Sequence, residues 1–509
     1  MTEAAVLIEP PKRTLRDKLF YGFGSVAYGV KDNGFGVLLM LYYNQVLGLP
    51  VATVAFALMV VLICDAIVDP ILGHISDNLR TAWGRRHPFM YAAILPVSLS
   101  YLALWNPPSG LNEDQLLIYL IVVAVAVRTF INFYEVPSTA LVTDLSPDYN
   151  QRTSFLSYRY FFGWWGGLTM NILAFSVFLR TEPGGPAGQL QREGYQDYAL
   201  FASALMAIAI LTSALGTHRL IPSFRQPPAP RPFNARRVVR ELGATLANRP
   251  FLIIVAAGMF NVMAFGIGGA MVTYIRTFFW ELTGQQIAII TLGNFGSAYA
   301  GLVLAPKLSA WIGKKRGCLL AVLLQLVLSP LVYLGRFADV MPPNGSDALL
   351  AILCVSSFIT TTLLVISGIL TTSMIADAVE HGEIKTGRRT DGFYFAANSF
   401  IAACLSGFGV FSAGLILAFA QFPEAAQPGQ VADAILFRMM VVEITAVAGL
   451  HLLALVVMSF YPISKAKHEA NLRTLAEQLD TPKTREAGEA AALAERGGSP
   501  VVPAGASPV

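Results

Sequence analysis

The chain has 509 residues, of which 55% are hydrophobic and 13% are charged, and its mean hydropathy is +0.56. Soluble globular proteins carry about 25% charged residues. Half that proportion leaves too little polar surface to cover soluble domains, which excludes a soluble enzyme, a nucleic-acid-binding protein and a disordered scaffold. The composition therefore predicts an integral membrane protein.

Cysteines and the N-terminus add little to this prediction. The four cysteines lie in or beside apolar runs without CxxC spacing, so we interpret them as small hydrophobic residues with no disulfide framework or zinc site. The first nineteen residues are polar, and the apolar run after them is too long for the core of a signal peptide, so we expect no cleaved signal.

Apolar segments long enough to cross a membrane recur along the whole chain, since a spanning helix needs about 20 such residues. They lie near residues 19–47, 52–76, 89–106, 115–143, 153–179, 198–221, 250–280, 285–312, 317–336, 348–380, 391–421 and 432–460. The predicted fold is therefore an all-α membrane protein with twelve transmembrane helices in two six-helix bundles.

The segments between these spans divide the chain into predicted regions. They are an N-terminal segment (1–18), a first bundle (19–221), a linker (222–249), a second bundle (250–460) and a largely disordered tail (461–509). Within the linker, Val238, Val239, Leu242 and Leu246 recur at helical spacing, which predicts a short amphipathic helix on the membrane surface.

The distribution of Lys and Arg predicts the orientation. Basic residues occur in alternate loops, for example Arg80, Lys314 and Arg388, whereas the intervening loops hold acids such as Glu113. Both termini and the linker should therefore be cytoplasmic, and we expect a bacterial inner (plasma) membrane. Two six-helix halves joined by such a linker match the major facilitator architecture, whose substrate site lies between the halves.

Asp65 and Asp69 lie deep in the second predicted span, where a charge costs roughly 2.5–3.5 kcal/mol on insertion scales. They are four residues apart and share one helix face. Two ionised carboxylates repel, so the pair is expected to hold a proton or to bind Na⁺ or Li⁺. Alternatively, one of them caps the helix break at Pro70 or pairs with a nearby basic residue.

Other polar residues within the spans are candidates for the substrate or ion site. Asp32 and Glu135 each complete an ion or substrate site, although Lys31 can instead simply neutralise Asp32. Arg159 is expected to point inward, because it lies about two turns into its span. The remaining candidates are Tyr28 and Tyr158, which can stack on a sugar ring, and Lys385, which is either a site residue or a plain loop residue.

The loop after the second span predicts a conformational latch. Gly73 allows close helix approach, and Asp77 can pair with Arg85 and Arg86 in one conformation only. The alternative is a basic loop that only sets the topology.

Several of these motifs resemble the glycoside–pentoside–hexuronide:cation symporter family of the major facilitator superfamily. The matching stretches are Asp65–Gly73, Trp83–Pro88, Lys31-Asp32, Glu135-Val136-Pro137, Tyr158–Phe162 and Ala376–Lys385. The resemblance implies cation ligands at Asp65 and Asp69, substrate contacts at Asp32, Glu135 and Arg159, with Glu135 also near the cation, and a functional lysine at Lys385. The sequence departs from the melibiose permeases of that family, which have aspartate in place of Glu135 and a sugar-stacking tryptophan in place of Thr139.

The predicted function is cation-coupled symport of a sugar, glycoside or similar small solute, with Na⁺, Li⁺ or H⁺ as the coupling ion and no cofactor. Two alternatives stay open, namely a transporter of lysophospholipids or other amphiphiles and a solute sensor that does not transport. The expected partners are the small-molecule substrate, which Thr139 would also contact, and membrane lipids, with no nucleic acid. We expect a monomer with no enzymatic activity.

Overall fold

The computed structural model describes residues 13–146, 149–181, 187–224, 248–386 and 391–462, without the side chains of 149–150, 153 and 379–396. Over these ranges the chain is helical, without strands. The first half comprises α1 (Leu15–Phe23), α2 (Ser25–Asn33), η1 (Gly34–Leu38), α3 (Leu39–Leu41), η2 (Tyr42–Val46), α4 (Val51–Asn78), α5 (His87–Trp105), α6 (Glu113–Leu145), α7 (Tyr149–Leu173), η3 (Ala174–Phe178), η4 (Gly188–Leu190), α8 (Arg192–His218) and η5 (Ile221–Ser223). The second half comprises α10 (Arg249–Tyr274), η6 (Ile275–Phe279), α11 (Gly284–Ile312), α12 (Lys314–Leu328), α13 (Leu331–Phe337), α14 (Asp347–Thr386), α15 (Asp391–Phe419) and α16 (Asp433–Ser459).

Eleven described helical segments are long and apolar enough to cross a membrane, which confirms the all-α membrane fold. The remaining predicted span, near residues 19–47, is not among these eleven because it is not one regular α-helix. It runs from α1 to η2 and is interrupted by π-helical turns at Gly34–Leu38 and Tyr42–Val46. The ninth predicted span is divided at Pro330, between α12 and α13, because proline has no N–H to continue the helical ladder.

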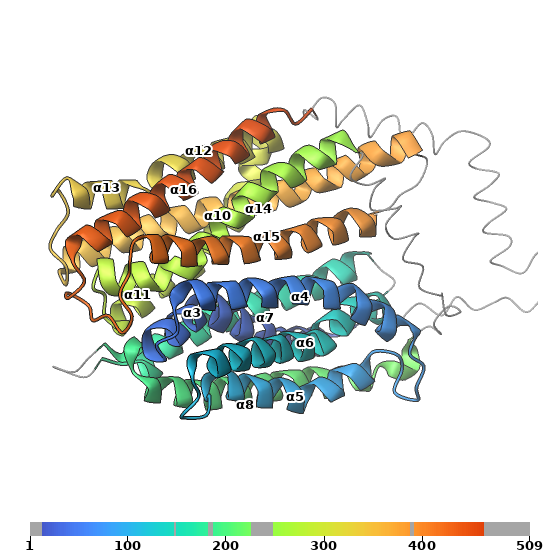
Figure 1. Cartoon of the computed structure of the whole chain (residues 1–509). Helices are drawn as coiled ribbons and strands as arrows, with labels where there is room; N and C mark the ends of the chain where they lie inside the picture. Colours follow the sequence, from blue (N-terminus) through green and yellow to red (C-terminus); the bar gives the residue numbers. More distant parts are fainter. Residues whose placement is uncertain (1–12, 147–148, 182–186, 225–247, 387–390, 463–509) are drawn as a thin grey trace, which may run out of the picture.

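The two halves lie side by side, with α1–α8 forming one group of helices and α10–α16 the other (Figure 1). α4 packs along α15, and α7 packs on α11. The limits of the five predicted regions stay predictions, and the predicted amphipathic helix and the tail lie outside the described residues.

Hydrogen bonds join the two halves at the end of the molecule remote from Leu15, where the first helical segment finishes. The Tyr274 hydroxyl donates to Asn44 Oδ1 at 2.8 Å, and Ala426 N donates to Gln45 Oε1 at 2.9 Å. Buried neutral hydrogen bonds of this kind close this end of the interface between the halves.

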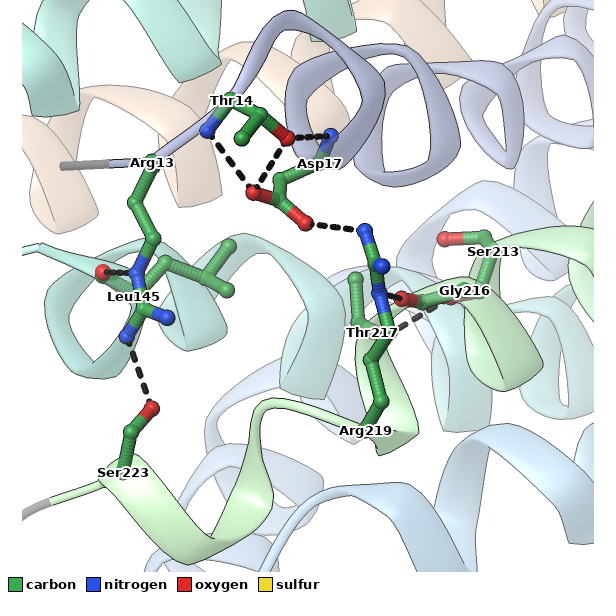
Figure 2. A network of polar contacts seen from close by, with 9 residues as sticks. All are labelled: Arg13, Thr14, Asp17, Leu145, Ser213, Gly216, Thr217, Arg219 and Ser223. Carbon is green, nitrogen blue, oxygen red and sulfur yellow. Dashed lines mark hydrogen bonds and ion pairs between the residues drawn. The ribbon is translucent and has the colours of Figure 1, made fainter. Parts of the chain in front are cut away.

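At the opposite end, a polar network fixes the start of the chain's first helix (Figure 2). Thr14 and Asp17 form a capping box at the start of α1, and Asp17 also pairs with Arg219 at 2.5 Å. Arg13 donates to the carbonyl of Leu145 at 2.6 Å and to Ser223 Oγ at 2.9 Å. The start of α1 is thereby tied to the ends of α6 and α8.

Glycines bring α2 and α7 into direct backbone contact. A Cβ on Gly29 would lie 2.0 Å from the Gly163 carbonyl oxygen, and one on Gly167 would lie 2.9 Å from the Gly29 oxygen. No side chain fits at this crossing. The contact matters for the site, because α2 carries Asp32 and α7 carries Arg159.

Replacing Gly29 with alanine should separate these helices and lower the free energy of unfolding by about 1–3 kcal/mol, the usual cost of overpacking. Thermal unfolding of the purified protein in detergent measures this loss. Gly258→Ala is the matched control, because a Cβ there meets nothing within 4 Å. It should leave the Tm unchanged or raise it, since alanine is the better helix former. Equal effects of the two variants would contradict the packing argument.

Candidate functional site

Seven ionisable side chains from α2, α4, α6 and α7 come together in the first half, and we call them the central charge cluster. The cluster consists of Lys31, Asp32, Asp65, Asp69, Arg128, Glu135 and Arg159, each of which interacts electrostatically with another member. The four carboxylates outnumber the three cationic groups, so the fully ionised cluster carries one net negative charge.

The Asp65 carboxylate is held by α6. Arg128 Nη1 forms an ion pair and hydrogen bond with Asp65 Oδ2, and Asn132 Nδ2 donates to Asp65 Oδ1 at 2.7 Å. The side chains of Asp65 and Arg128 are only 12% and 11% exposed. This is the alternative raised by the sequence, in which one acid of the pair has a basic partner.

Asp69 lies one turn further along α4 and is exposed. In the described part of the chain it forms no ion pair, although it lies within electrostatic reach of Lys31 and Arg128. The two acids therefore differ. Asp65 has a fixed positive partner, whereas Asp69 is exposed and has no ion pair among the described residues.

Lys31 and Asp32 form an ion pair at 2.8 Å, with exposed side-chain fractions of 3% and 41%. Lys31 Nζ also lies 4.3 Å from the centre of the Tyr28 ring, a cation–π contact. Lys31 thus partners Asp32, as the alternative interpretation proposed, but it leaves the Asp32 carboxylate accessible. The same contact covers one face of the ring expected to stack on a sugar.

Arg159 joins α7 to α6. Its guanidinium donates to Ser138 Oγ at 2.8 Å and lies 3.8 Å from Glu135 Oε1. Thr139 is exposed, and its hydroxyl donates to the Glu135 carbonyl at 2.7 Å. The Glu135 side chain, which is 25% exposed, and the exposed Thr139 therefore border the same region.

Two other expected substrate residues are not brought into this cluster by any described contact. Tyr158 is partly buried on α7, where its backbone packs close to Gly22. Lys385 lies in α14, and its side chain is outside the described residues.

The predicted latch residues meet a partner that the sequence did not reveal. Asp144, at the end of α6, pairs with Arg85 at 2.9 Å and with Arg86 at 3.0 Å, while Arg86 also lies 3.6 Å from Asp77. All these contacts stay within the first half. A Cβ on Gly73 would make an ordinary 3.6 Å contact with Val136, so close helix approach does not require glycine there in this conformation.

Among the residues that the structure describes, no group of three or more His, Cys, Asp or Glu side chains is placed to hold a metal ion. A cation bound by Asp69 would therefore need oxygens from hydroxyl groups, main chain or water besides one or two carboxylates. Na⁺ and Li⁺ are hard cations that accept such mixed oxygen ligands.

Arg128 and Asn132 are site residues that the sequence reasoning missed. Arg128 lies in the predicted span 115–143. The cost of a cation in a spanning helix, which singled out Arg159, applies equally to Arg128 and could have identified it.

Arg128→Met should leave Asp65 as a buried carboxylate without a cationic partner and lower the free energy of unfolding by about 3–5 kcal/mol. Adding Asp65→Asn to the same chain should restore most of this loss, and Arg438→Met, an exposed position on α16, should have little effect. Thermal unfolding of the wild type, Arg128→Met, Asp65→Asn, the double variant and Arg438→Met measures the coupling. Additive losses in the double variant would contradict the ion pair.

Comparisons with known proteins identify the family of the chain. The family described as MFS/sugar transport protein matches residues 20–465. The chain is 25% identical to the uncharacterized symporter sll1374 of Synechocystis sp., over 89% of this chain and 94% of that protein. It is 22% identical to the putative glycoside/cation symporter YagG of Escherichia coli, over 91% of this chain and 95% of that protein.

A solved structure of a D-xylose-proton symporter has the same fold, with a TM-score of 0.60 at 13% identity over 89% of this chain and 98% of that one. The family match covers both halves and the whole central charge cluster. The chain therefore belongs to the MFS/sugar transport protein family of the major facilitator superfamily, as the resemblance to the glycoside–pentoside–hexuronide:cation symporters implied, and it is a transporter rather than an enzyme.

Proposed function

We propose that this protein couples the uptake of a neutral sugar or glycoside to one monovalent cation. The observation that carries the proposal is the charge balance of the central charge cluster, in which four carboxylates face three cationic groups. One bound H⁺, Na⁺ or Li⁺ makes the cluster neutral. A charged group in apolar surroundings is costly unless it is neutralised, which gives the ion its affinity.

Asp69 is the proposed primary ion ligand, because it is exposed and lacks the fixed partner that holds Asp65. Glu135 is the second proposed ligand, since Asp69 and Glu135 interact electrostatically. Asp65 contributes indirectly, because its bond to Arg128 draws one positive charge away from Asp69. Binding of the ion then favours one conformation over the other by its difference in affinity.

Asp32, Glu135 and Arg159 are the proposed contacts of the sugar. The two carboxylates can accept hydrogen bonds from sugar hydroxyls, and the guanidinium can donate. An anionic sugar is disfavoured, because the cluster has no surplus positive charge. Thr139 is too small to replace a stacking tryptophan, which favours a substrate other than a galactoside.

The described hydrogen bonds between the halves close the end remote from Leu15. With both termini cytoplasmic, as we propose, the conformation is closed toward the outside. Substrate and ion would then be released toward the cytoplasm of a bacterial cell.

A thermal-shift screen of neutral sugars, glycosides and lysophospholipids, each with Na⁺, Li⁺ or choline, should identify the ligand. A ligand at 100 times its Kd raises the free energy of unfolding by about 2.7 kcal/mol. We expect stabilisation by a neutral sugar or glycoside that depends on one cation. A response to lysophospholipids alone would replace the sugar with an amphiphile as the substrate.

In proteoliposomes, Asp69→Asn should abolish the stimulation of sugar uptake by a cation gradient, with at least a tenfold loss at low substrate concentration. Asp433→Asn, an exposed acid at the start of α16, is the matched control and should transport normally. Counterflow of labelled sugar in the wild-type protein distinguishes a transporter from a sensor. Full ion coupling in Asp69→Asn would refute the assignment of the ion site.

A further inference from the structure

The proposed mechanism uses neither of two buried acids in the second half, Asp377 and Glu443, and of these Asp377 pairs with Lys314. Glu443 lies on α16, about three turns from its start, and is 7% exposed. In the described part of the chain it forms no hydrogen bond or ion pair. This contrasts with Asp65 in the first half, which has both Arg128 and Asn132 as partners.

Glu443 borders a small cavity between α12, α13 and α16. Gln325, Ser329, Tyr333 and His451 contribute its other polar side chains. The cavity measures about 20 Å³, which is room for one water molecule or a bare ion of similar size. A hydrated ion, a sugar or a lipid head group does not fit.

The cavity lies beside the helix break at Pro330, and this proline is one of its lining residues. Proline has no N–H, so the carbonyl of Leu326, four residues earlier, loses its usual helical donor. Leu326 lines the cavity together with Pro330. Nδ1 of His451 is also buried without a hydrogen-bond partner. The cavity therefore combines a lone carboxylate with other groups whose hydrogen-bonding capacity is unused.

No cationic side chain in the described surroundings neutralises Glu443. Tyr333 on α13 interacts with it electrostatically, and Arg276 on η6 interacts with Tyr333 and Cys354 instead. His451 lies about two turns further along the same helix. A buried carboxylate without a partner costs several kcal/mol, which a bound cation offsets.

We propose that Glu443 and this cavity form a second monovalent-cation site, which takes a proton or a bare alkali ion. The site lies in the second half, whereas all seven members of the central charge cluster lie in the first. An ion here contacts α12, α13 and α16 and would stabilise their packing without touching the sugar. The protein would thus respond to ions through two separate sites.

The test uses the purified full-length protein without substrate, in the Asp69→Asn background that removes the proposed primary ion ligand of the first half. Thermal unfolding is followed against pH in choline chloride and, at fixed pH, against NaCl at constant ionic strength. We expect the Tm to rise by several degrees in one of these titrations. A rise with acidity identifies the ligand as the proton, and a rise with NaCl identifies an alkali ion.

Adding Glu443→Gln should abolish this rise, because the neutral amide needs no counter-charge, while adding Asp433→Asn should leave it intact. Adding Tyr333→Phe, which removes only a cavity hydroxyl, should raise several-fold the ion concentration that gives half of the rise in Tm. This variant keeps the test valid if Glu443→Gln does not fold. Flat titrations, or a rise unchanged in Glu443→Gln, would overturn the proposal. Neither result depends on transport, so failure here leaves the proposed symport mechanism unaffected.

Discussion

The need to neutralise charge in apolar surroundings organises the first half of this protein. Arg128 could not lie at its position on α6 without the Asp65 carboxylate, nor could Lys31 be 3% exposed without Asp32 beside it. The pair of Arg128 and Asp65 joins α6 to α4, whereas Lys31 and Asp32 both lie on α2. Arg159 joins α7 to α6 through Glu135 and Ser138. One carboxylate is left over when the pairs are complete, and that remainder is the basis of the proposed ion binding.

Precise helix packing is what allows these side chains to meet. Gly29 and Gly163 let α2 and α7 touch at the backbone, which brings together the two helices that carry Asp32 and Arg159. The π-helical turn at Gly34–Leu38 begins two residues after Asp32. Such turns occur frequently at functional sites, because they disturb the regular helical hydrogen bonds.

Hydropathy predicted the twelve spans because the membrane acts on each helix separately: each needs its own apolar length and satisfies its own backbone hydrogen bonds. The ion-pair partner of each charged residue cannot be predicted in the same way. Asp65 and Arg128 are 63 residues apart, and so are Lys314 and Asp377, which form an ion pair in the second half. Nothing local in the sequence encodes such pairs. The free-energy cost of a charge in a spanning helix therefore identified candidate residues such as Asp65 and Arg159, but it did not identify their contacts. Asp144 was missed because it lies at a helix end, where a charged side chain can reach water and costs little free energy.

The described ion pairs and the described contacts between the halves are chemically distinct. Each ion pair, from Lys31 with Asp32 to Lys314 with Asp377, joins residues of the same half. The hydrogen bonds between the halves, such as Tyr274 with Asn44, join neutral groups. A neutral hydrogen bond contributes about 0.5–1.5 kcal/mol, whereas separating a buried ion pair costs several times more.

This division suits a molecule whose halves move as units. Rocking one half against the other exchanges weak neutral bonds and leaves each described ion pair intact. The conformational equilibrium then stays close enough to balance for one bound cation to shift it. A moderate difference in ion affinity between the two conformations is therefore sufficient for coupling.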